Sequence, residues 1–129
     1  MNVLKNSVTL IFFILIIVFF FVIAFRSNKL DNDLKKNGVI TKGKIFKATH
    51  GKNTMKFLYY NFIDEKGLTH ENSIGVELKN KEYFIGRSFP VVFLPEDAEN
   101  NCLLVTRQYF EIYGIVFPDS LNWVDDYVY

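Results

Sequence analysis

The sequence predicts a mainly β domain carried behind one N-terminal transmembrane helix. Three observations indicate this: an uncharged apolar run at residues 8–25, a change from helical to extended patterns after Gly38, and turn residues that separate about five short segments. Of the 129 residues, about 100 remain for the domain, which is a common size for a single hydrophobic core. We therefore expect one domain and no second core.

The apolar run reads VTLIFFILIIVFFFVIAF and contains no charge, proline or glycine. As a helix it covers roughly 27 Å, which is close to the thickness of a hydrocarbon core. The competing interpretation is a cleaved signal peptide, whose apolar region is roughly 7–15 residues long and precedes a small-residue cleavage site. This run is longer and ends IAFRSNK. We expect residues 1–26 to form an uncleaved anchor that contacts lipid in a single pass of the plasma (inner) membrane.

Basic residues gather after the span and predict its orientation. Only Lys5 precedes the span, whereas several basic residues follow it: Arg26, Lys29, Lys35, Lys36, Lys42 and Lys44. The positive-inside rule then places the C-terminal domain in the cytoplasm. Asp31 and Asp33 interrupt the basic run, and folded domains translocate despite moderate charge, so the opposite side stays open.

Residues 27–38 (SNKLDNDLKKNG) connect the span to the domain. Leu30 and Leu34 are four residues apart, which allows an amphipathic extension of the helix ended by a left-handed glycine at Gly38. The alternative is a solvated linker, and the sequence leaves both open.

Two strands are expected first in the domain at residues 39–105. Residues 39–49 (VITKGKIFKAT) are rich in β-branched residues, with Gly43 at an expected bend. Residues 55–64 (MKFLYYNFID) are apolar on both faces. Such a strand is expected at a central position in a curled sheet or barrel.

A hairpin is expected to follow, because Asp64-Glu65-Lys66-Gly67 is typical of a turn closed by a glycine bulge. It returns residues 68–74 as a polar strand, and residues 75–84 fit either a short helical turn or a loop. Residues 89–94 (FPVVFL) predict a strand in which Pro90 favours an edge or strand-start position. Residues 101–105 (NCLLV) predict the last strand.

Residues 106–129 predict a short helix from Thr106 to Gly114 and an aromatic, acidic tail. We expect the tail to pack on the barrel through Phe117 and Trp123. A candidate interaction surface consists of Phe117, Trp123, Tyr127 and Tyr129, and a partner-binding tail remains the alternative to packing.

Several short motifs of residues 41–105 together resemble DUF3592, a family of small domains of unknown function in bacterial membrane-anchored proteins. The motifs are Thr41-Lys42-Gly43-Lys44-Ile45, Tyr59-Tyr60-Asn61-Phe62, the Asp64-to-Gly67 turn, Tyr83-Phe84-Ile85-Gly86, Pro90-Val91-Val92-Phe93-Leu94-Pro95 and Asn101-Cys102-Leu103-Leu104. The resemblance implies a small OB-like or SH3-like β-barrel of about five strands beside a transmembrane helix, with no established activity. The chain departs from the family in its single span and its aromatic tail.

Residues that carry chemistry are few and scattered. No ligand spacing for a metal surrounds His50 or His70, and Cys102 stands in an apolar strand, where a buried inert thiol is usual. Turn carboxylates such as Asp64 and Glu96 are normally solvated, and the glycines form no phosphate loop. We expect no catalytic site, no metal and no cofactor.

Nucleic acid is also not expected as a partner. Lysines near the aromatic strand are reminiscent of surfaces that stack single-stranded bases. However, the aromatic residues alternate as core residues do, and the net charge of the chain is only +1.

Three functional hypotheses remain. The first is a non-enzymatic, membrane-anchored interaction or scaffold module that contacts another membrane or envelope protein. The second is an immunity or stress-protection protein that neutralises a toxin at the membrane, which a neighbouring toxin gene would favour. The third is a hydrolase that uses Cys102 or His70, for which alanine at either position would abolish function without loss of stability.

Overall fold

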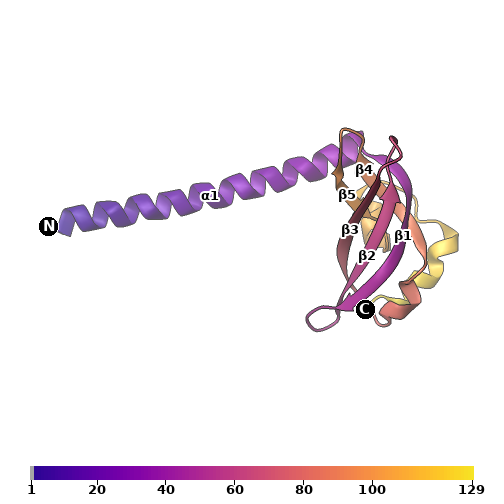
Figure 1. Ribbon diagram of the computed structural model, residues 1–129. Coiled ribbons are helices and arrows are strands. Elements are labelled where there is room, and N and C mark those ends of the chain that lie inside the picture. The colour runs from indigo at the N-terminus through magenta and orange to yellow at the C-terminus, as the bar shows by residue number, and fades with distance from the viewer. Residues whose placement is uncertain (1) are drawn as a thin grey trace. The chain divides into compact units, whose positions relative to one another are not determined.

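A computed structural model describes residues 2–129 and, for Asn2, Leu4 and residues 27–31, the backbone alone. The chain divides into two compact units, Met1–Asn32 and Asp33–Tyr129 (Figure 1). Helix α1 spans Asn2–Asn37. Most of the helix lies in the first unit, and its last residues, from Asp33 on, belong to the second.

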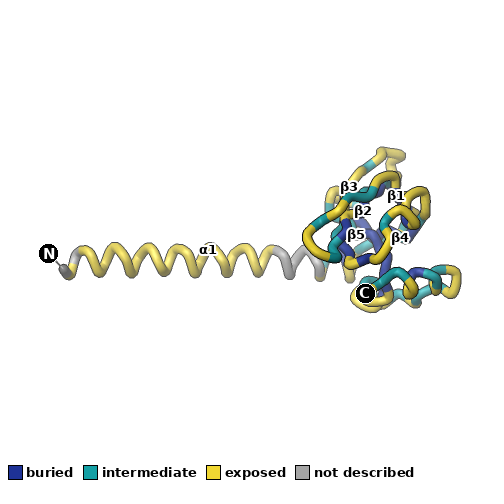
Figure 2. The backbone as a smooth tube through the Cα atoms, turned by 90° about the horizontal axis from the view of Figure 1, so that it is seen from below, coloured by how far each residue is buried: buried dark blue, intermediate teal, exposed yellow. Residues whose placement is uncertain are grey.

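The apolar part of α1 has no packing partner within the protein. Lys5–Arg26 has a mean hydropathy of 3.4, none of its residues is buried, and it is the one segment of the described chain long and apolar enough to cross a membrane. A signal sequence near an N-terminus shares these properties. Figure 2 shows the residues of this stretch of α1 as exposed.

Residues 27–37 extend the helix, so the alternative of a linker is wrong. Leu34 is only 4% exposed and belongs to a small apolar cluster with Val92, Leu104 and Phe110. Gly38 ends the helix by donating its N–H to the Leu34 carbonyl at 3.0 Å. Gly38 does not have a positive φ, so the left-handed conformation expected from the sequence is wrong. Glycine is required because a Cβ there would lie 2.3 Å from the Leu34 oxygen and 2.4 Å from Val92 Cγ1.

Five antiparallel strands then form a nearly closed barrel, which confirms the predicted fold class. The order across the sheet is β3-β2-β1-β4-β5. The strands are β1 (Val39–His50), β2 (Met55–Ile63), β3 (Thr69–Glu77), β4 (Ser88–Leu94) and β5 (Asp97–Leu103) (Figure 1). Long β1 makes closure possible because its first half pairs with β4 and its second half with β2.

Strand β1 has its register irregularity a few residues after Gly43. The β1–β2 register shifts between Ile45 and Lys47, and such bulges bend a strand. Gly43 has a different role, because a Cβ there would lie 2.5 Å from Val91 Cγ2 on β4.

Strand β2 supplies much of the core. Leu58, Tyr60 and Phe62 are buried on its inner face, whereas Phe57 is 39% and Ile63 is 58% exposed on the outer face. The inner face therefore follows the expected alternation. The apolar outer face is not covered within the second unit. Figure 2 shows buried positions gathered where the strands surround the barrel interior.

The β2–β3 hairpin has the predicted turn. Gly67 is left-handed at φ +81° and donates its N–H to the Asp64 carbonyl at 3.1 Å. Strand β3 continues to Glu77, beyond the expected end at Ile74. The ambiguous region that follows contains a one-turn 3-10 helix, η1 (Lys81–Phe84).

Strand β4 is an interior strand, so the edge alternative for Pro90 is wrong, whereas Pro90 does lie near the start of the strand, as its third residue. Strand β4 lies between β1 and β5. The Pro90 carbonyl accepts from Leu104 N–H at 2.9 Å, just past the end of β5. Because the nitrogen of a strand residue faces the same side as its carbonyl, the missing donor of Pro90 faces Leu104 at the end of β5, and the pairing of β4 with β1 is unaffected. Strand β5 begins at Asp97, earlier than expected, because Leu94 already pairs with Asp97.

The C-terminal segment is part of the second unit and packs on the barrel core through Phe117 and Trp123, as expected. Helix α2 (Arg107–Ile112) begins after Thr106, whose side chain makes no cap hydrogen bond. A 3-10 segment, η2 (Asp119–Tyr127), follows and places Val124 at full burial within the main core.

Candidate interaction surfaces

The structure distributes the four predicted surface residues over three places. Phe117 packs edge-on against Phe110, with ring centroids 5.0 Å apart, beneath the guanidinium of Arg107. Trp123 and Tyr127 join residues of the η1 region, and Tyr129 is 64% exposed beside a groove. They therefore do not form one continuous aromatic patch.

Trp123 and Tyr127 form an aromatic–arginine cluster with Tyr83 and Arg87. The Tyr83 and Tyr127 rings stack with centroids 4.7 Å apart. The Arg87 guanidinium carbon lies 4.6 Å from the Trp123 centroid and 5.4 Å from that of Tyr83. A cation held at such distances over ring faces is favourable. A hydrogen bond with Tyr83 also raises the pKa of the Tyr127 hydroxyl.

The loop before β4 places Arg87 over these rings. Gly86 adopts φ +83° and donates its N–H to the Ile45 carbonyl at 2.7 Å. The Arg87 carbonyl accepts a hydrogen bond from Ile45 N–H at 3.0 Å. The Nε of the Arg87 side chain donates to the Tyr83 carbonyl at 3.1 Å. The backbone is thus tied to β1 while the side chain of Arg87 remains exposed. Tyr83 is 48% exposed, so the cluster is open to a partner.

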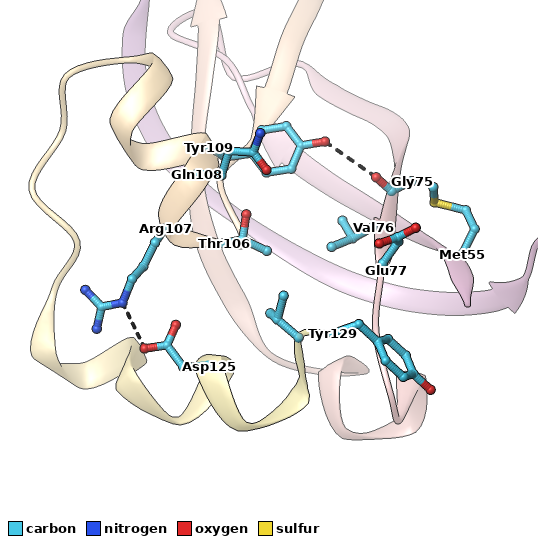
Figure 3. Close-up of a pocket in the computed structure, with 11 residues that line it drawn as sticks. Met55, Gly75, Val76, Glu77, Thr106, Arg107, Gln108, Tyr109, Asp125 and Tyr129 are labelled. Atoms are coloured by element: carbon cyan, nitrogen blue, oxygen red, sulfur yellow. Dashed lines mark hydrogen bonds and ion pairs between the residues drawn. The ribbon is translucent and has the colours of Figure 1, made fainter. Parts of the chain in front are cut away.

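A groove of about 360 Å³ lies between the end of β3 and the start of α2 (Figure 3). Gly75 and Glu77 line one side, and Arg107 and Tyr109 line the other. The Tyr109 hydroxyl reaches toward the Gly75 carbonyl at 3.5 Å.

Side chains close the barrel where its two edge strands meet. Asn72 of β3 donates to the Asn101 side-chain oxygen of β5 at 3.0 Å, and the Tyr60 hydroxyl donates to the same oxygen. Burial raises the pKa of Tyr60, which keeps this hydroxyl a donor. The imidazole of His70 joins Asp64 at 2.8 Å and Glu99 at 3.3 Å. This seam therefore contains a polar network in place of a backbone ladder.

The family model, curated-protein and solved-structure comparisons give no match for this chain. Support for a function therefore comes from its own geometry.

Cys102 and His70, the two residues considered for a hydrolase, both contact apolar core residues. Cys102 belongs to the apolar cluster that includes Leu104, whereas His70 stacks on the core residue Phe62 with centroids 5.3 Å apart. Among the described residues, no group of three or more His, Cys, Asp or Glu side chains is placed to hold a metal ion.

Sequence reasoning missed Tyr83, Arg87, Gly75 and Glu77. The Tyr83-Phe84-Ile85-Gly86 motif contributes to the family resemblance, but nothing in its spacing pairs it with a tail residue forty positions away. The position of Gly75 and Glu77 beside the groove depends on strand order, which has no local signal.

His70 predicts a pH dependence of stability. Its hydrogen bond to Asp64 raises the pKa of the imidazole, and Glu99 adds to this, while the same bond to His70 lowers the pKa of Asp64. The His70 contribution is present below the ordinary histidine pKa of about 6.5 and is lost as pH rises through the raised value. The Asp64 contribution is present above the ordinary aspartate pKa of about 3.9 and is lost as pH falls through the lowered value.

We therefore expect the urea midpoint of the full chain in nonionic detergent to fall between about pH 6 and pH 8. His70→Gln should flatten this fall, because glutamine does not titrate. Asp64→Asn should flatten it as well, because it removes the carboxylate that raises the His70 pKa. Asparagine keeps an oxygen for the turn N–H groups of Lys66 and Leu68, so the turn is preserved. Equal slopes in all three proteins would show that the seam does not titrate as described.

Proposed function

We propose that this chain is a non-enzymatic, single-pass, membrane-anchored interaction module. Residues 5–26 anchor it in the plasma or inner membrane, and the barrel, of the DUF3592-like type, faces the cytoplasm beside the basic residues that follow the span. Its role is to bind another membrane or envelope protein through the aromatic–arginine cluster.

The arrangement of exposed Tyr83 and Arg87 with half-buried Trp123 and Tyr127 is the observation that carries this proposal. Tryptophan, tyrosine and arginine are the residue types that dominate binding energy at protein interfaces. Here the rings are already packed against one another and Arg87 is already placed over two of them. Binding would therefore order few additional side chains, which lowers its entropic cost.

A photocrosslinking experiment on the full chain in native membranes tests the proposal. A benzophenone amino acid at position 83 should give a discrete adduct with a partner protein. The same amino acid at Tyr59 is the matched control, because Tyr59 is a partly exposed tyrosine on the outer face of β2, also beneath a cation, Lys47. We expect no adduct from that position.

Arg87→Ala should reduce the adduct at position 83 about tenfold, as expected for a residue at an interface hot spot. The variant keeps the backbone bonds between residue 87 and Ile45, so its circular dichroism should be unchanged. Equal adducts from positions 83 and 59, or an adduct unaffected by Arg87→Ala, would contradict the proposal. The structure also argues against deleting residues 115–129 as a test, since this removes the buried Val124.

A further inference from the structure

The outer side of β1 and β2 combines exposed apolar and basic side chains. Among the apolar ones, Phe46 is 42%, Phe57 is 39% and Ile63 is 58% exposed. We define this basic–apolar face by Lys42, Lys44, Phe46, Lys47, Phe57 and Ile63. Exposed apolar residues that gather on one surface mark contact sites with partners or membranes.

The strand register brings these side chains together. Lys47 pairs with Tyr59 across β1 and β2, and its ammonium lies 5.2 Å from the centroid of the Tyr59 ring. The register irregularity after Ile45 adds Phe46 beside them, because Phe46 and Lys47 are consecutive and both exposed. Lys44 follows at the next exposed position of β1. Basic and apolar side chains are therefore interleaved and do not form two separate patches.

The C-terminal segment leaves this face uncovered. It packs beside β4, where Pro118 and Leu121 border one cleft with Ser88 and Pro90. Figure 2 shows the segment on the side of β4 that is away from β2 and β3. The outer side of β2 is therefore open to contact from outside the domain.

The charge of the face is positive. Strands β1 and β2 contain no Asp or Glu, and Lys42, Lys44 and Lys47 take part in none of the ion pairs formed by described residues. The exposed carboxylates nearby are Glu71 and Glu77 of the neighbouring β3. The uncompensated charge across β1 and β2 therefore complements an anionic surface.

Connectivity keeps a bilayer within reach of the second unit. Residues 27–32 are all that separates Lys5–Arg26 from that unit, and such a segment spans at most about 20 Å when fully extended. A tether of this length raises the effective concentration of a membrane crossed by Lys5–Arg26. The residue types also fit a headgroup region, where rings and lysine stems contact acyl chains while the ammonium groups remain in water.

We propose that the basic–apolar face binds the surface of a bilayer that contains anionic lipid. Phe46, Phe57 and Ile63 enter the headgroup region, and the lysines contact lipid phosphates. The inference rests on the membrane anchor of the proposed function, but it does not use the aromatic–arginine cluster.

Photocrosslinking to lipid tests the inference. The full chain carries a benzophenone amino acid at Tyr59 and is reconstituted in nanodiscs of mixed phosphatidylcholine and phosphatidylglycerol. Irradiation should add the mass of one phospholipid to the intact chain, so position 59 still gives no adduct with a partner protein. In nanodiscs of phosphatidylcholine alone the yield should fall about fivefold or more, because the attraction of the lysines to anionic lipid is lost.

Tyr129 is the matched control position. It is also a tyrosine beneath a lysine, with Lys79 Nζ 5.8 Å from its ring centroid, but it lies outside the face. Because Tyr129 is 64% exposed whereas Tyr59 is half-buried, exposure alone favours the control. We expect the lipid adduct at position 59 and not at position 129.

Lys44→Glu should lower the adduct yield at position 59 about threefold or more, because a cation near an anionic surface becomes an anion. Lys79→Glu makes the same change of net charge at an exposed lysine outside the face. It should change the yield less than twofold, about the effect of a screened surface charge. Equal yields at positions 59 and 129, equal yields with and without phosphatidylglycerol, or equal effects of the two lysine variants would overturn the inference.

Failure of this inference can be told apart from failure of the proposed function. The nanodiscs contain no partner protein, and Arg87→Ala should leave the lipid adduct intact, so a missing lipid adduct says nothing against the aromatic–arginine cluster. Release of the chain from membranes by alkaline carbonate would instead contradict the anchor itself.

Discussion

Phe84→Ala is expected to lower the free energy of unfolding of the barrel by about 3–5 kcal/mol, the range for removing a buried phenylalanine. Phe84 is fully buried although it lies in the short 3-10 helix η1. The centroid of its ring lies 6.1 Å from the ring centroid of Phe89 of β4, 5.2 Å from that of Trp123 and 6.0 Å from that of Tyr127. The substitution therefore opens a cavity between the barrel and the C-terminal segment.

Urea unfolding of the full chain in nonionic detergent, followed by fluorescence, measures this loss. The chain has one tryptophan, Trp123, and it contacts the substituted ring. Ile85→Ala is the control, because Ile85 is the next residue and is exposed; it should cost less than about 1 kcal/mol. A Phe84→Ala loss no larger than that of the control would show that η1 and η2 do not share a core.

Two arginines in the apolar part of α1 are expected to remove the protein from the membrane. Leu15→Arg and Phe19→Arg lie near the middle of Lys5–Arg26. Each costs about 2.5–3.5 kcal/mol at the centre of a span, so that together they cost about 5–7 kcal/mol. The measurement is the fraction that stays in the membrane pellet after alkaline carbonate extraction.

The control exchanges Leu15→Phe with Phe19→Leu, which preserves the apolar character of the helix. The unchanged chain and this control should remain in the pellet at the full mass of 15.1 kDa. A shortened, soluble protein would contradict the anchor and would indicate a signal sequence. A reporter fused after Tyr129 then tests the proposed cytoplasmic side of the domain.

Local sequence was sufficient where neighbouring residues determine the structure. The turn at Asp64 to Gly67 follows from a left-handed glycine after polar residues. The inner face of β2 follows from the alternation of Leu58, Tyr60 and Phe62. Both depend on interactions within a few residues, and both agree with the structure.

Predictions failed where a neighbour in space determined the outcome. Pro90 suggested an edge or strand-start position, but β4 is an interior strand and the missing donor faces Leu104 at the end of β5. Gly38 suggested a left-handed cap, but it is required by close contact with Val92, far along the chain. Such effects have no local signal, because they depend on which strands become neighbours.

For the candidate surfaces too, the sequence indicated some of the residues, and the tertiary structure decided which residues they contact. Aromatic content in the tail directed attention to Trp123 and Tyr127, which the structure does place in an aromatic–arginine cluster. Their partners Tyr83 and Arg87 come from the loop before β4 and were not predicted. Phe117 and Tyr129 lie elsewhere, so one expected surface became three separate environments.

By itself, the sequence determined that a long apolar helix precedes a mainly β domain, because hydropathy and alternation act within single elements. Only the tertiary structure decided which residues form a surface. Strand order placed the end of β3 beside the C-terminal segment, and packing of the tail brought Trp123 to Arg87. The physical reason is that a surface is made by residues distant in sequence, and their meeting depends on how the whole barrel closes.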